Sequence, residues 1–406
     1  MLEQNTCRSC RAELRSLVLD LGVQPVADVL LDAQQLCEPE RALPLRVFVC
    51  NACGLAQLPA ADVDAGDLTG VHGHGAAFST TVQGHIHAWA DMLLDRIGPV
   101  ACVLDVASGD GALLRPFVER GVTVLGLEPN ADFAARADVP TEQGFFGLEA
   151  ARQLSARHGQ FDLILVNQAL AHAADLDDFV AGLACALRAG GSIAIEFHHA
   201  LSLIRGQFDV ACHAHRSYLS VHALEATLSR HGLAIVDAEQ IDLNGGSVRA
   251  TAAHASERRG ATAAVNKVRH AEGACGLATP GGYAHVSATA RRVKAGLLAF
   301  LDDAAASGAR VVGYGAPSRG ITLLNYCGIS PEHLPFTVDR SPEKQGRFLP
   351  GSRIPVLAPE AIAASRPEFV LILPWALSDE IMHQMQCVRD WGGRFVVAVP
   401  ELRILD

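Results

Sequence analysis

The sequence predicts an α/β protein with a doubly wound, Rossmann-like sheet, preceded by a small four-cysteine domain and followed by a second Rossmann-like α/β domain. Three observations predict this fold class. Two Cys-x-x-Cys pairs lie near the N-terminus, a Gly-Asp-Gly turn follows a buried-strand pattern near residue 100, and a second strand, glycine turn and helix begin near residue 310. In a chain of 406 residues we therefore expect three domains. Their predicted limits are residues 1–66, 67–255 and 256–406.

Composition limits the possible partners. The formal net charge is −11 and no basic run stands out, so we expect no nucleic-acid partner. No apolar run approaches the roughly 18–20 residues that span a bilayer, so we expect no membrane partner either. The first ten residues show no charged-then-apolar leader, which leads us to expect a cytoplasmic protein. A small-molecule substrate and a monomer or weak dimer are the remaining expectations.

The two cysteine pairs open the first domain. Each Cys-x-x-Cys can place two thiolates on one side of a tight turn, and two such turns complete a tetrahedral site of the kind that structural zinc prefers. In a reducing compartment, paired cysteines more often bind metal than form disulfides. The alternative is four unrelated buried thiols. A four-thiolate site has no open position, so we expect a structural zinc ion held by Cys7, Cys10, Cys50 and Cys53.

The second domain begins with an apolar run that reads as a buried parallel strand, followed by a glycine turn into a helix. Glu128 ends the next strand about 20 residues later, the usual distance for an acid that binds ribose hydroxyls. The turn reads Gly-Asp-Gly and lacks the Gly-x-Gly-x-x-Gly pattern, which favours S-adenosylmethionine over a dinucleotide. The alternative is an ordinary turn without a ligand. The candidate cofactor-binding residues are Asp105, Ala107, Gly109, Gly111, Glu128, Pro129 and Asn167.

Histidines gather where the later strands of this sheet end. His172, His198 and His199 follow predicted strands, and the stretch CHAHRSY (212–218) comes next. In a doubly wound sheet the carboxyl ends of the strands form the ligand-binding edge, so this polar cluster indicates a functional site. The cluster could also bind a catalytic metal. Adjacent strand residues such as His198 and His199 point to opposite faces, which speaks against that reading.

The third domain carries the turn GYGAPSRG (313–320), with Asp339 at the end of the following strand. This is a second nucleotide-type turn, but it lacks the complete dinucleotide fingerprint. We therefore do not expect NAD to bind there.

These motifs, in this order, resemble those of one family over essentially the whole chain. Besides the cysteine pairs, they are VLDVASGDGALLRPF, NQALAH, QFD with H-A-H-x-SY, NGGSVR, GYGAPSRGITLLNYCGI and VDRSPEKQGRFLPGSRIPV. The family is that of the sugar C-methyltransferases of antibiotic deoxysugar biosynthesis. The resemblance implies a methyltransferase that uses S-adenosylmethionine and structural zinc. It also implies methylation of a carbon next to the ketone of a nucleotide-linked, dTDP-like keto-deoxysugar.

The resemblance also assigns residues, with departures. The family's proposed base falls on His215, and a second functional histidine falls on His172. The family's Tyr-His-Glu-His motif reads Cys-His-Ala-His here, so Cys212 and Ala214 replace tyrosine and glutamate. The family's upstream tyrosines are absent from residues 71–81, and His198-His199 replace Pro-Tyr. A divergent activity, such as O-methylation or a metal-dependent or non-methylating reaction on another natural product, therefore stays open, as does binding without turnover.

The chemistry follows from these side chains. A base that removes the hydrogen beside a ketone creates an enolate that can attack the methyl of S-adenosylmethionine. Histidine suits this role because its pKa lies near the operating pH. The enolate oxygen needs a donor, for which His172, Asn167 or Tyr218 could serve. A diphosphate needs cations. The candidate catalytic residues are His215, His172, Tyr218 and the loop-orienting His213, and the candidate substrate-binding residues are Arg319, Lys344, Arg347 and Asn244.

Overall fold

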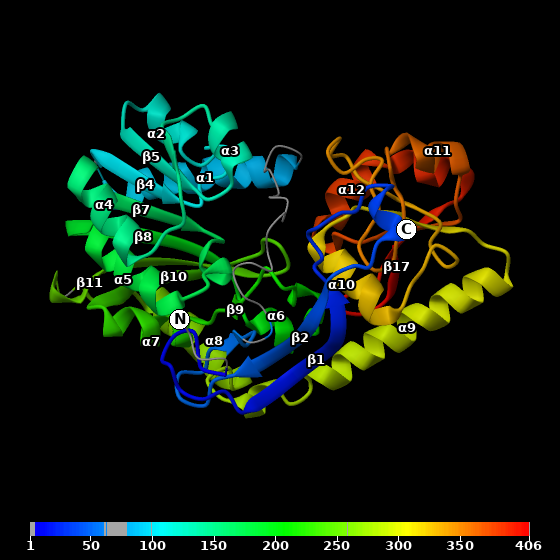
Figure 1. The fold of residues 1–406 in the computed structure, drawn as a ribbon, viewed down its shortest axis with the longest axis horizontal. Coiled ribbons are helices and arrows are strands. Elements are labelled where there is room, and N and C mark those ends of the chain that lie inside the picture. The colour runs from blue at the N-terminus through cyan, green and yellow to red at the C-terminus, as the bar shows by residue number, and fades with distance from the viewer. Residues whose placement is uncertain (1–4, 61, 63–78, 99, 258, 406) are drawn as a thin grey trace.

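The computed structural model describes residues 5–60, 62, 79–98, 100–257 and 259–405. The described residues form two lobes, which the N-terminal hairpin and one long helix connect along the lower side (Figure 1). The predicted boundary between residues 66 and 67 and the tyrosine-free residues 71–78 lie outside the described part. The domain limits stay a prediction.

A seven-stranded sheet forms the centre of the first lobe, in the order β10-β11-β8-β7-β4-β5-β6. The strands from β4 to β8 run parallel, and β11 and β10 add an antiparallel edge. Parallel strands must be covered on both faces, which explains their continuous apolar runs. The strand bounds are β4 Cys102–Val106, β5 Thr123–Glu128, β6 Thr141–Gln143, β7 Phe161–Asn167, β8 Leu187–His198, β10 Leu233–Ile241 and β11 Ser247–His254.

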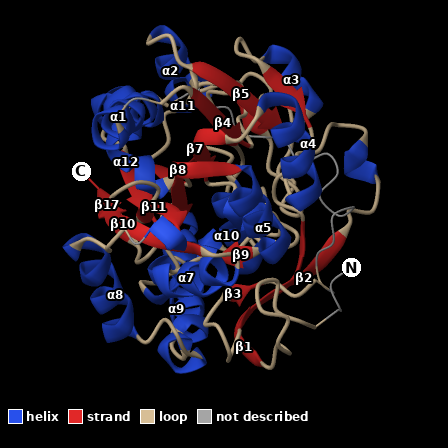
Figure 2. Ribbon diagram, turned by 90° about the vertical axis from the view of Figure 1, so that its left-hand side faces the viewer, coloured by secondary structure: helices blue, strands red, loops and turns tan. Residues whose placement is uncertain are grey.

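Helices cover both faces of this sheet (Figure 2). Helices α1 and α2 share one apolar cluster with the sheet through Trp89 and Phe117. Helices α4, α5 and α7 share another through Leu154, Leu183 and Leu224. The helix bounds in this lobe are α1 Thr80–Ile97, α2 Arg115–Glu119, α3 Ala131–Arg136, α4 Leu148–His158, α5 Leu176–Ala186, α6 Leu201–Ile204, α7 Val221–Arg230 and α8 Ala263–Cys275.

The N-terminal sheet joins segments that are far apart in the sequence. Its order is β1 (Ser16–Pro25), β2 (Ala42–Val49), β3 (Ala56–Gln57) and β9 (Ser217–Tyr218). The β1–β2 hairpin packs against helices α9 (Val286–Ala306) and α10 (Ser318–Cys327), in a core that all three parts of the chain share. This packing fixes the position of one lobe against the other.

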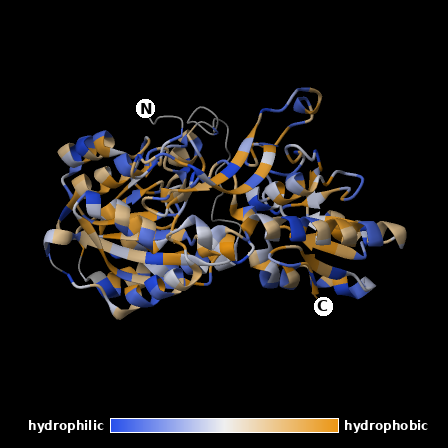
Figure 3. Cartoon of the chain, turned by 90° about the horizontal axis from the view of Figure 1, so that it is seen from below, coloured by the Kyte–Doolittle hydropathy of each residue, from blue (hydrophilic) through white to orange (hydrophobic). Residues whose placement is uncertain are grey.

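A six-stranded sheet forms the second lobe, in the order β14-β13-β12-β15-β16-β17, with only β17 antiparallel among these strands. Its apolar residues concentrate in the strands (Figure 3). The predicted fold class is therefore confirmed. No helix among the described residues has the length and apolar character needed to cross a membrane. The remaining bounds are β12 Val311–Tyr314, β13 Thr337–Val338, β14 Val356–Leu357, β15 Phe369–Ile372, β16 Arg394–Val397, β17 Arg403–Leu405, α11 Glu360–Ser365 and α12 Ser378–Gln384.

Candidate functional site

The four predicted zinc ligands come together at one point. The Sγ atoms of Cys7, Cys10, Cys50 and Cys53 all lie within 4.8 Å of one another. The Cys7–Cys53 and Cys10–Cys50 pairs are 3.6 Å and 3.5 Å apart. Tetrahedral zinc with bonds of about 2.3 Å would separate its sulfurs by about 3.8 Å, so the four cysteines fit one ion with little movement. Hydrogen bonds within the cluster lower the pKa of Cys50 and raise that of Cys53, so the four thiols are close enough to share their protons.

The first glycine loop is fixed to the acid predicted to bind ribose. Ala107 has a positive φ of 61°, and its amide donates to the carbonyl of Leu127 over 2.8 Å. The buried carboxylate of Glu128 accepts hydrogen bonds from the amides of Gly109 and Asn130, both over 2.8 Å. Pro129 lies between these contacts, at the end of β5. The loop and the strand end therefore form one rigid unit.

Polar atoms around this loop fit a polar ligand. Asp105 Oδ1, Ser108 Oγ and Asn167 Oδ1 are buried and have no hydrogen-bond partner among the described residues. Buried polar groups in native proteins nearly always have a partner, so these three oxygens indicate groups that a ligand satisfies. Burial, followed by the charge of Glu128, raises the pKa of Asp105 well above its ordinary value.

The two glycines of the loop differ in what surrounds them. A Cβ at Gly109 would meet no atom within 4 Å, so that side of the loop is open. At Gly111, where φ is 83°, a Cβ would lie 2.5 Å from Val139 Cγ2, so only glycine fits. The residues present thus fit S-adenosylmethionine, with Glu128 for its ribose and the other polar groups for the rest of the molecule.

A cavity of about 580 Å³ lies between the ends of β7 and β8 and the second glycine loop. Four of the predicted catalytic and substrate-binding residues line it: His172, His215, Asn244 and Arg319. The other four, His213, Tyr218, Lys344 and Arg347, do not. The lining also contains Asp28, Gln168, His198, Cys212, Ala214, Pro317, Ser318 and residues 373–377.

Backbone carbonyls orient two of the cavity's imidazoles. His215 Nδ1 lies 3.0 Å from the carbonyl oxygen of Val210, and His172 Nδ1 lies 2.8 Å from that of Ala214. The two ring centroids are 5.1 Å apart. A carbonyl only accepts, so each neutral ring carries its hydrogen on Nδ1 and keeps a lone pair on Nε2. Burial, and next the charge of His172, lower the pKa of His215 to about 4.

His213 and Tyr218 are buried outside the cavity. His213 Nε2 lies 3.2 Å from the carbonyl oxygen of Leu43, and burial lowers its pKa. This contact fits its predicted role in orienting the loop. The hydroxyl of Tyr218 has no hydrogen-bond partner among the described residues, and burial raises its pKa well above the ordinary value. A role for Tyr218 as donor to the substrate stays a prediction.

Arg319 lines the cavity, but an acid already pairs with it. Its Nε and one of its NH groups each lie 3.1 Å from the buried carboxylate of Asp209, and its other NH group donates to the carbonyl of Asn244 over 2.8 Å. The guanidinium also lies 4.7 Å from the ring centroid of Trp375, whose Nε1 donates to Asp209 over 2.8 Å. Asp209 and Trp375 were not predicted. The QFD motif contains Asp209, but no local signal linked it to an arginine 110 residues away.

The two other predicted cations contact their own domain. Lys344 Nζ donates to the carbonyl of Ala316 over 2.9 Å and lies 3.5 Å from Asp339. Arg347 Nε donates to the carbonyl of Glu343 over 3.0 Å. Their roles in substrate binding stay predictions.

A buried charge cluster near the end of strand β8 links residues that the sequence had not connected. Glu196, which is 1% exposed, accepts hydrogen bonds from His85 over 2.8 Å and from Arg249 over 2.9 Å. The Arg249 guanidinium lies 5.4 Å from the ring centroid of Trp89. The cluster therefore holds helix α1 against the end of strand β8. His85 lies in a helix without a motif, so the sequence gave no sign of it.

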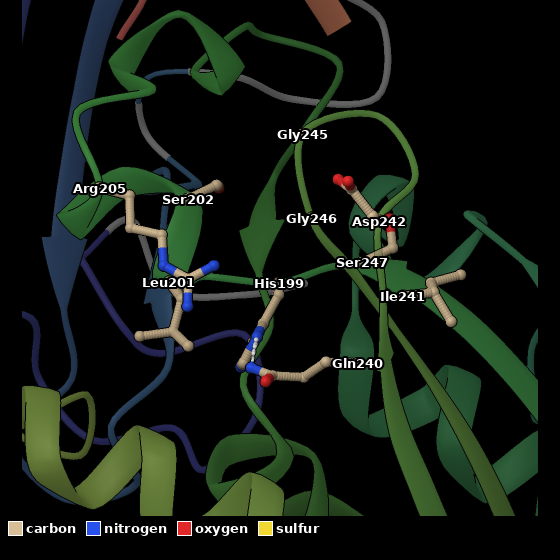
Figure 4. A pocket seen from close by; sticks show the side chains of 10 residues that line it. All are labelled: His199, Leu201, Ser202, Arg205, Gln240, Ile241, Asp242, Gly245, Gly246 and Ser247. Carbon is tan, nitrogen blue, oxygen red and sulfur yellow. Dashed lines mark hydrogen bonds between the residues drawn. The ribbon is translucent and has the colours of Figure 1, made fainter.

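A smaller hollow of about 390 Å³ has residues 240–242 and 245–247, around the β10–β11 turn, in its lining (Figure 4). His199 lies at its centre, where its ring contacts Gln240 at 3.2 Å and Glu272 at 2.8 Å. Glu272 also accepts from the amides of Val221 and His222, at the start of α7. His199 thus belongs to a structural network and does not share a site with His198, as the opposite faces of a strand require.

The glycine loop with its acid, next to a four-thiolate domain, defines the class of the protein: it is an S-adenosylmethionine-dependent methyltransferase with structural zinc. Family models match a zinc binding domain at residues 7–64, a methyltransferase domain at 80–238 and a C-methyltransferase C-terminal domain at 242–400. The chain is 31% identical to the C-methyltransferase NovU of Streptomyces niveus, over 98% of this chain and 96% of that protein. The chain belongs to this C-methyltransferase family, and the resemblance drawn from its sequence is confirmed.

Other similarities cover only part of the chain. A ubiquinone biosynthesis O-methyltransferase of Bradyrhizobium is 28% identical over 23% of this chain and 38% of that protein. Among solved structures, a SAM-dependent methyltransferase from Archaeoglobus fulgidus is 18% identical over 39% of this chain and 72% of that chain, with a TM-score of 0.34. Magnesium protoporphyrin IX methyltransferase from Synechocystis is 15% identical over 44% and 89% of the two chains, with a TM-score of 0.35.

Proposed function

We propose that the protein methylates a carbon next to the ketone of a nucleotide-linked, dTDP-like keto-deoxysugar, through an enolate that His215 generates. One observation carries this proposal. His215 is an imidazole with a fixed tautomer, and its Nε2 lone pair belongs to a ring that lines the cavity. A neutral, oriented imidazole can accept the C–H proton. Its pKa of about 4 makes it a weaker base than an ordinary histidine, so the reaction also needs a donor that stabilises the enolate oxygen.

The position of the cavity supports transfer from a bound cofactor. Asn167, a candidate cofactor contact, ends strand β7, and the next residue, Gln168, lines the cavity. The loop after β4 lies at the same edge of the sheet, because β4 and β7 are parallel neighbours. Cofactor and substrate would therefore meet across the end of β7, as methyl transfer requires.

Each side chain then has a defined task. When bound, S-adenosylmethionine supplies an electrophilic methyl group. His215 Nε2 takes the proton from the α-carbon, and the protein holds that carbon in line with the methyl group. His172 lies beside His215 and is the proposed second functional histidine. Arg319 and Asn244 line the cavity and are the proposed contacts to the sugar nucleotide, while Lys344 and Arg347 stay candidates for its diphosphate.

The four-thiolate site near the N-terminus supports a cytoplasmic location, because zinc thiolates persist in a reducing compartment. We infer a small-molecule substrate and neither a nucleic-acid nor a membrane partner. The proposed assembly is a monomer or weak dimer.

A second candidate is an O-methyltransferase acting on another natural product. It is favoured by Cys212 and Ala214, which line the cavity where the family motif has tyrosine and glutamate. An imidazole base can deprotonate a hydroxyl as well as a carbon. A catalytic metal clip gains no comparable support, because His213 and His215 contact different carbonyls and only His215 lines the cavity.

The test is incubation of the purified protein with methyl-labelled S-adenosylmethionine and a panel of dTDP-4-keto-deoxysugars. We expect a new carbon–methyl bond, located by NMR. In deuterated water we also expect exchange of the hydrogen next to the ketone, even without the cofactor. Methylation at oxygen without such exchange would support the second candidate and overturn the first.

A further inference from the structure

His198 ends strand β8, and it lines the same cavity as His215. The centroids of the two rings are 5.7 Å apart. The backbone amide of His198 donates to Gln168 Oε1 over 3.1 Å, which fixes the end of the strand. Within the described part of the chain, neither ring nitrogen of His198 has a hydrogen-bond partner. Since His198 lines the cavity, its ring nitrogens are open to a ligand there.

The other two imidazoles of the cavity cannot donate to a substrate while they are neutral. His172 and His215 each present Nδ1 to a backbone carbonyl, so each has its hydrogen there and a lone pair on Nε2. His215 can therefore accept a proton at Nε2. Neither ring can give a hydrogen bond to an oxygen on the substrate, so the proposed reaction lacks a donor from this pair.

Most of the remaining polar donors of the cavity have other partners. The hydroxyl of Ser318 donates to Asp28, and the guanidinium of Arg319 donates to Asp209. The amide of Gln168 faces Glu196 over 3.4 Å. The side-chain amide of Asn244 and the thiol of Cys212, which also line the cavity, have no acceptor among the described residues. A thiol is a weak donor, so Asn244 is the competitor to His198.

Enolisation needs two groups that act on neighbouring atoms. The base attacks the hydrogen of the α-carbon, and the donor stabilises the negative charge that develops on the ketone oxygen, two bonds away. The ring of His198 lies next to the ring of His215, so the two can reach these atoms of one substrate. Burial, and next the charges of His215, Arg319 and His172, keep the pKa of His198 well below its ordinary value. A neutral imidazole can donate a hydrogen bond without losing its proton to the product.

We propose that His198 is a catalytic residue that donates an N–H hydrogen bond to the substrate's ketone oxygen and to the enolate oxygen formed from it. This inference rests on the proposed function. His215 Nε2 takes the α-proton, the C–H electron pair forms the new C=C bond, and the carbonyl π pair moves to the oxygen that faces His198. The carbon–methyl bond then forms as the sulfur–methyl bond breaks, the carbonyl is restored, and the proton leaves His215 to water. His198 keeps its own proton throughout.

The position has a sequence correlate. His198 stands where the resembling family has proline, which has no donor group. The same chain has Ala214 where the family motif has glutamate. A donor gained at residue 198 would therefore accompany a polar group lost at residue 214 of the same cavity.

The test compares three variants with the wild-type protein on a dTDP-4-keto-deoxysugar that the wild type turns over. His198→Phe keeps a ring without a donor, His198→Asn restores a short N–H donor, and His270→Phe changes an exposed histidine on helix α8 as a matched control. The readout is exchange of the α-hydrogen in deuterated water without cofactor. We expect His198→Phe to slow exchange by about 10²–10³-fold, as loss of one oxyanion donor does. His198→Asn should exchange the α-hydrogen at least about tenfold faster than His198→Phe. The affinity for S-adenosylmethionine should not change in either variant.

Each other outcome has a defined meaning. Exchange by His198→Phe within about threefold of the wild-type rate overturns the inference and leaves the proposed function intact, and a large loss in Asn244→Ala would then identify the donor. A wild-type protein that exchanges no α-hydrogen overturns the proposed function and the inference together. If His198→Phe does not fold, the test is the carbonyl stretching frequency of a ¹³C-labelled ketone substrate. Infrared spectroscopy measures it on the wild-type protein and on His198→Asn, free and bound. The stretch should fall on binding, and an unshifted stretch overturns the inference.

Discussion

The two glycine loops of this chain are built alike, and we propose different uses for them. In each, a parallel strand ends in a glycine turn, and an acid at the end of the neighbouring strand accepts hydrogen bonds from two backbone amides. Glu128 accepts from Gly109 and Asn130, both over 2.8 Å. Asp339 accepts from Ala316 over 2.8 Å and from Ser341 over 2.9 Å.

The surroundings of the loops differ. The first loop has open space beside Gly109 and buried oxygens without a protein partner, among the described residues, at Asp105 and Asn167. The second loop is filled by its own domain. A Cβ at Gly315 would lie 2.5 Å from Pro374, and Lys344 Nζ covers the Ala316 carbonyl at 2.9 Å.

This difference teaches that a nucleotide-type turn is not by itself a nucleotide site. The first loop leaves polar groups for a ligand to satisfy, and the second satisfies them internally. What the second loop offers is the start of helix α10, where Ser318 and Arg319 face the substrate cavity. We therefore assign the cofactor to the first loop and the cavity wall to the second.

The largest expected effect comes from His215, which belongs to neither loop. Loss of a positioned general base slows the chemical step by about 10²–10⁴-fold. His215→Ala should therefore lose methyl transfer and exchange of the α-hydrogen, and it should bind S-adenosylmethionine as the wild type does. Calorimetry measures the binding of S-adenosylmethionine, and the exchange rate measures removal of the α-hydrogen. A fully active variant would remove His215 from the reaction, and His172 would be the next base to examine.

The second-largest expected effect is on stability, and it tests whether Arg319 of the second loop pairs mainly with the protein itself. Arg319→Leu leaves the buried carboxylate of Asp209 without its guanidinium. Breaking a buried ion pair in this way costs about 3–5 kcal/mol. Urea unfolding should show this loss, and the double variant with Asp209→Asn should regain part of it. Arg291→Leu, which changes an exposed arginine on helix α9, is the control and should stay within about 0.5 kcal/mol.

The stability of Arg319→Leu thus reports what the arginine mainly contacts. An unchanged urea midpoint together with weaker substrate binding would mean that the substrate, and not Asp209, is its principal partner. The second loop would then be an open anion site, and the contrast with the first loop would fail.

A matched pair of variants tests the two acids directly. Glu128→Ala should weaken S-adenosylmethionine binding by about 1–3 kcal/mol, because the ribose hydroxyls lose their acceptor. Asp339→Ala removes an equivalent acceptor from the second loop and should leave the cofactor affinity unchanged, although it also lowers stability. Calorimetry on both proteins gives the answer. Equal losses of affinity would show that the two loops share one ligand.

Sequence and structure agree where the signal is local. The cysteine pairs and the strand–turn–acid unit around Glu128 lie within short stretches, so spacing alone predicted their geometry. The cavity wall could not be predicted in the same way. Asp28 and Trp375 reach it from separate segments, and Asp209 pairs with the wall residue Arg319 from a third. Strand β9, which joins the N-terminal sheet from residue 217, is likewise set by long-range pairing.

The smallest expected effect is that of pH, and it follows from the location of His215 between the two loops. Burial, and next the charge of His172, lower its pKa to about 4 from an ordinary value of 6.5. A base acts when neutral, so the acid limb of kcat/KM should lie near pH 4. Between about pH 8 and pH 5.5 we expect less than a twofold change from this group, whereas an imidazole of pKa 6.5 would lose about tenfold.

The same pKa has a consequence for folding. The unfolded chain binds a proton at this histidine more readily than the folded protein does, so stability rises with pH in the window between the two pKa values. The contribution of His215 is fully present above about pH 6.5 and is lost as the pH falls towards about 4. Parallel measurements of kcat/KM and of the urea midpoint over this range should therefore separate, with stability declining first while activity per folded molecule stays constant. A joint fall of both with a midpoint near pH 6.5 would mean that solvent reaches His215, and that the cavity between the loops is more open than the structure indicates.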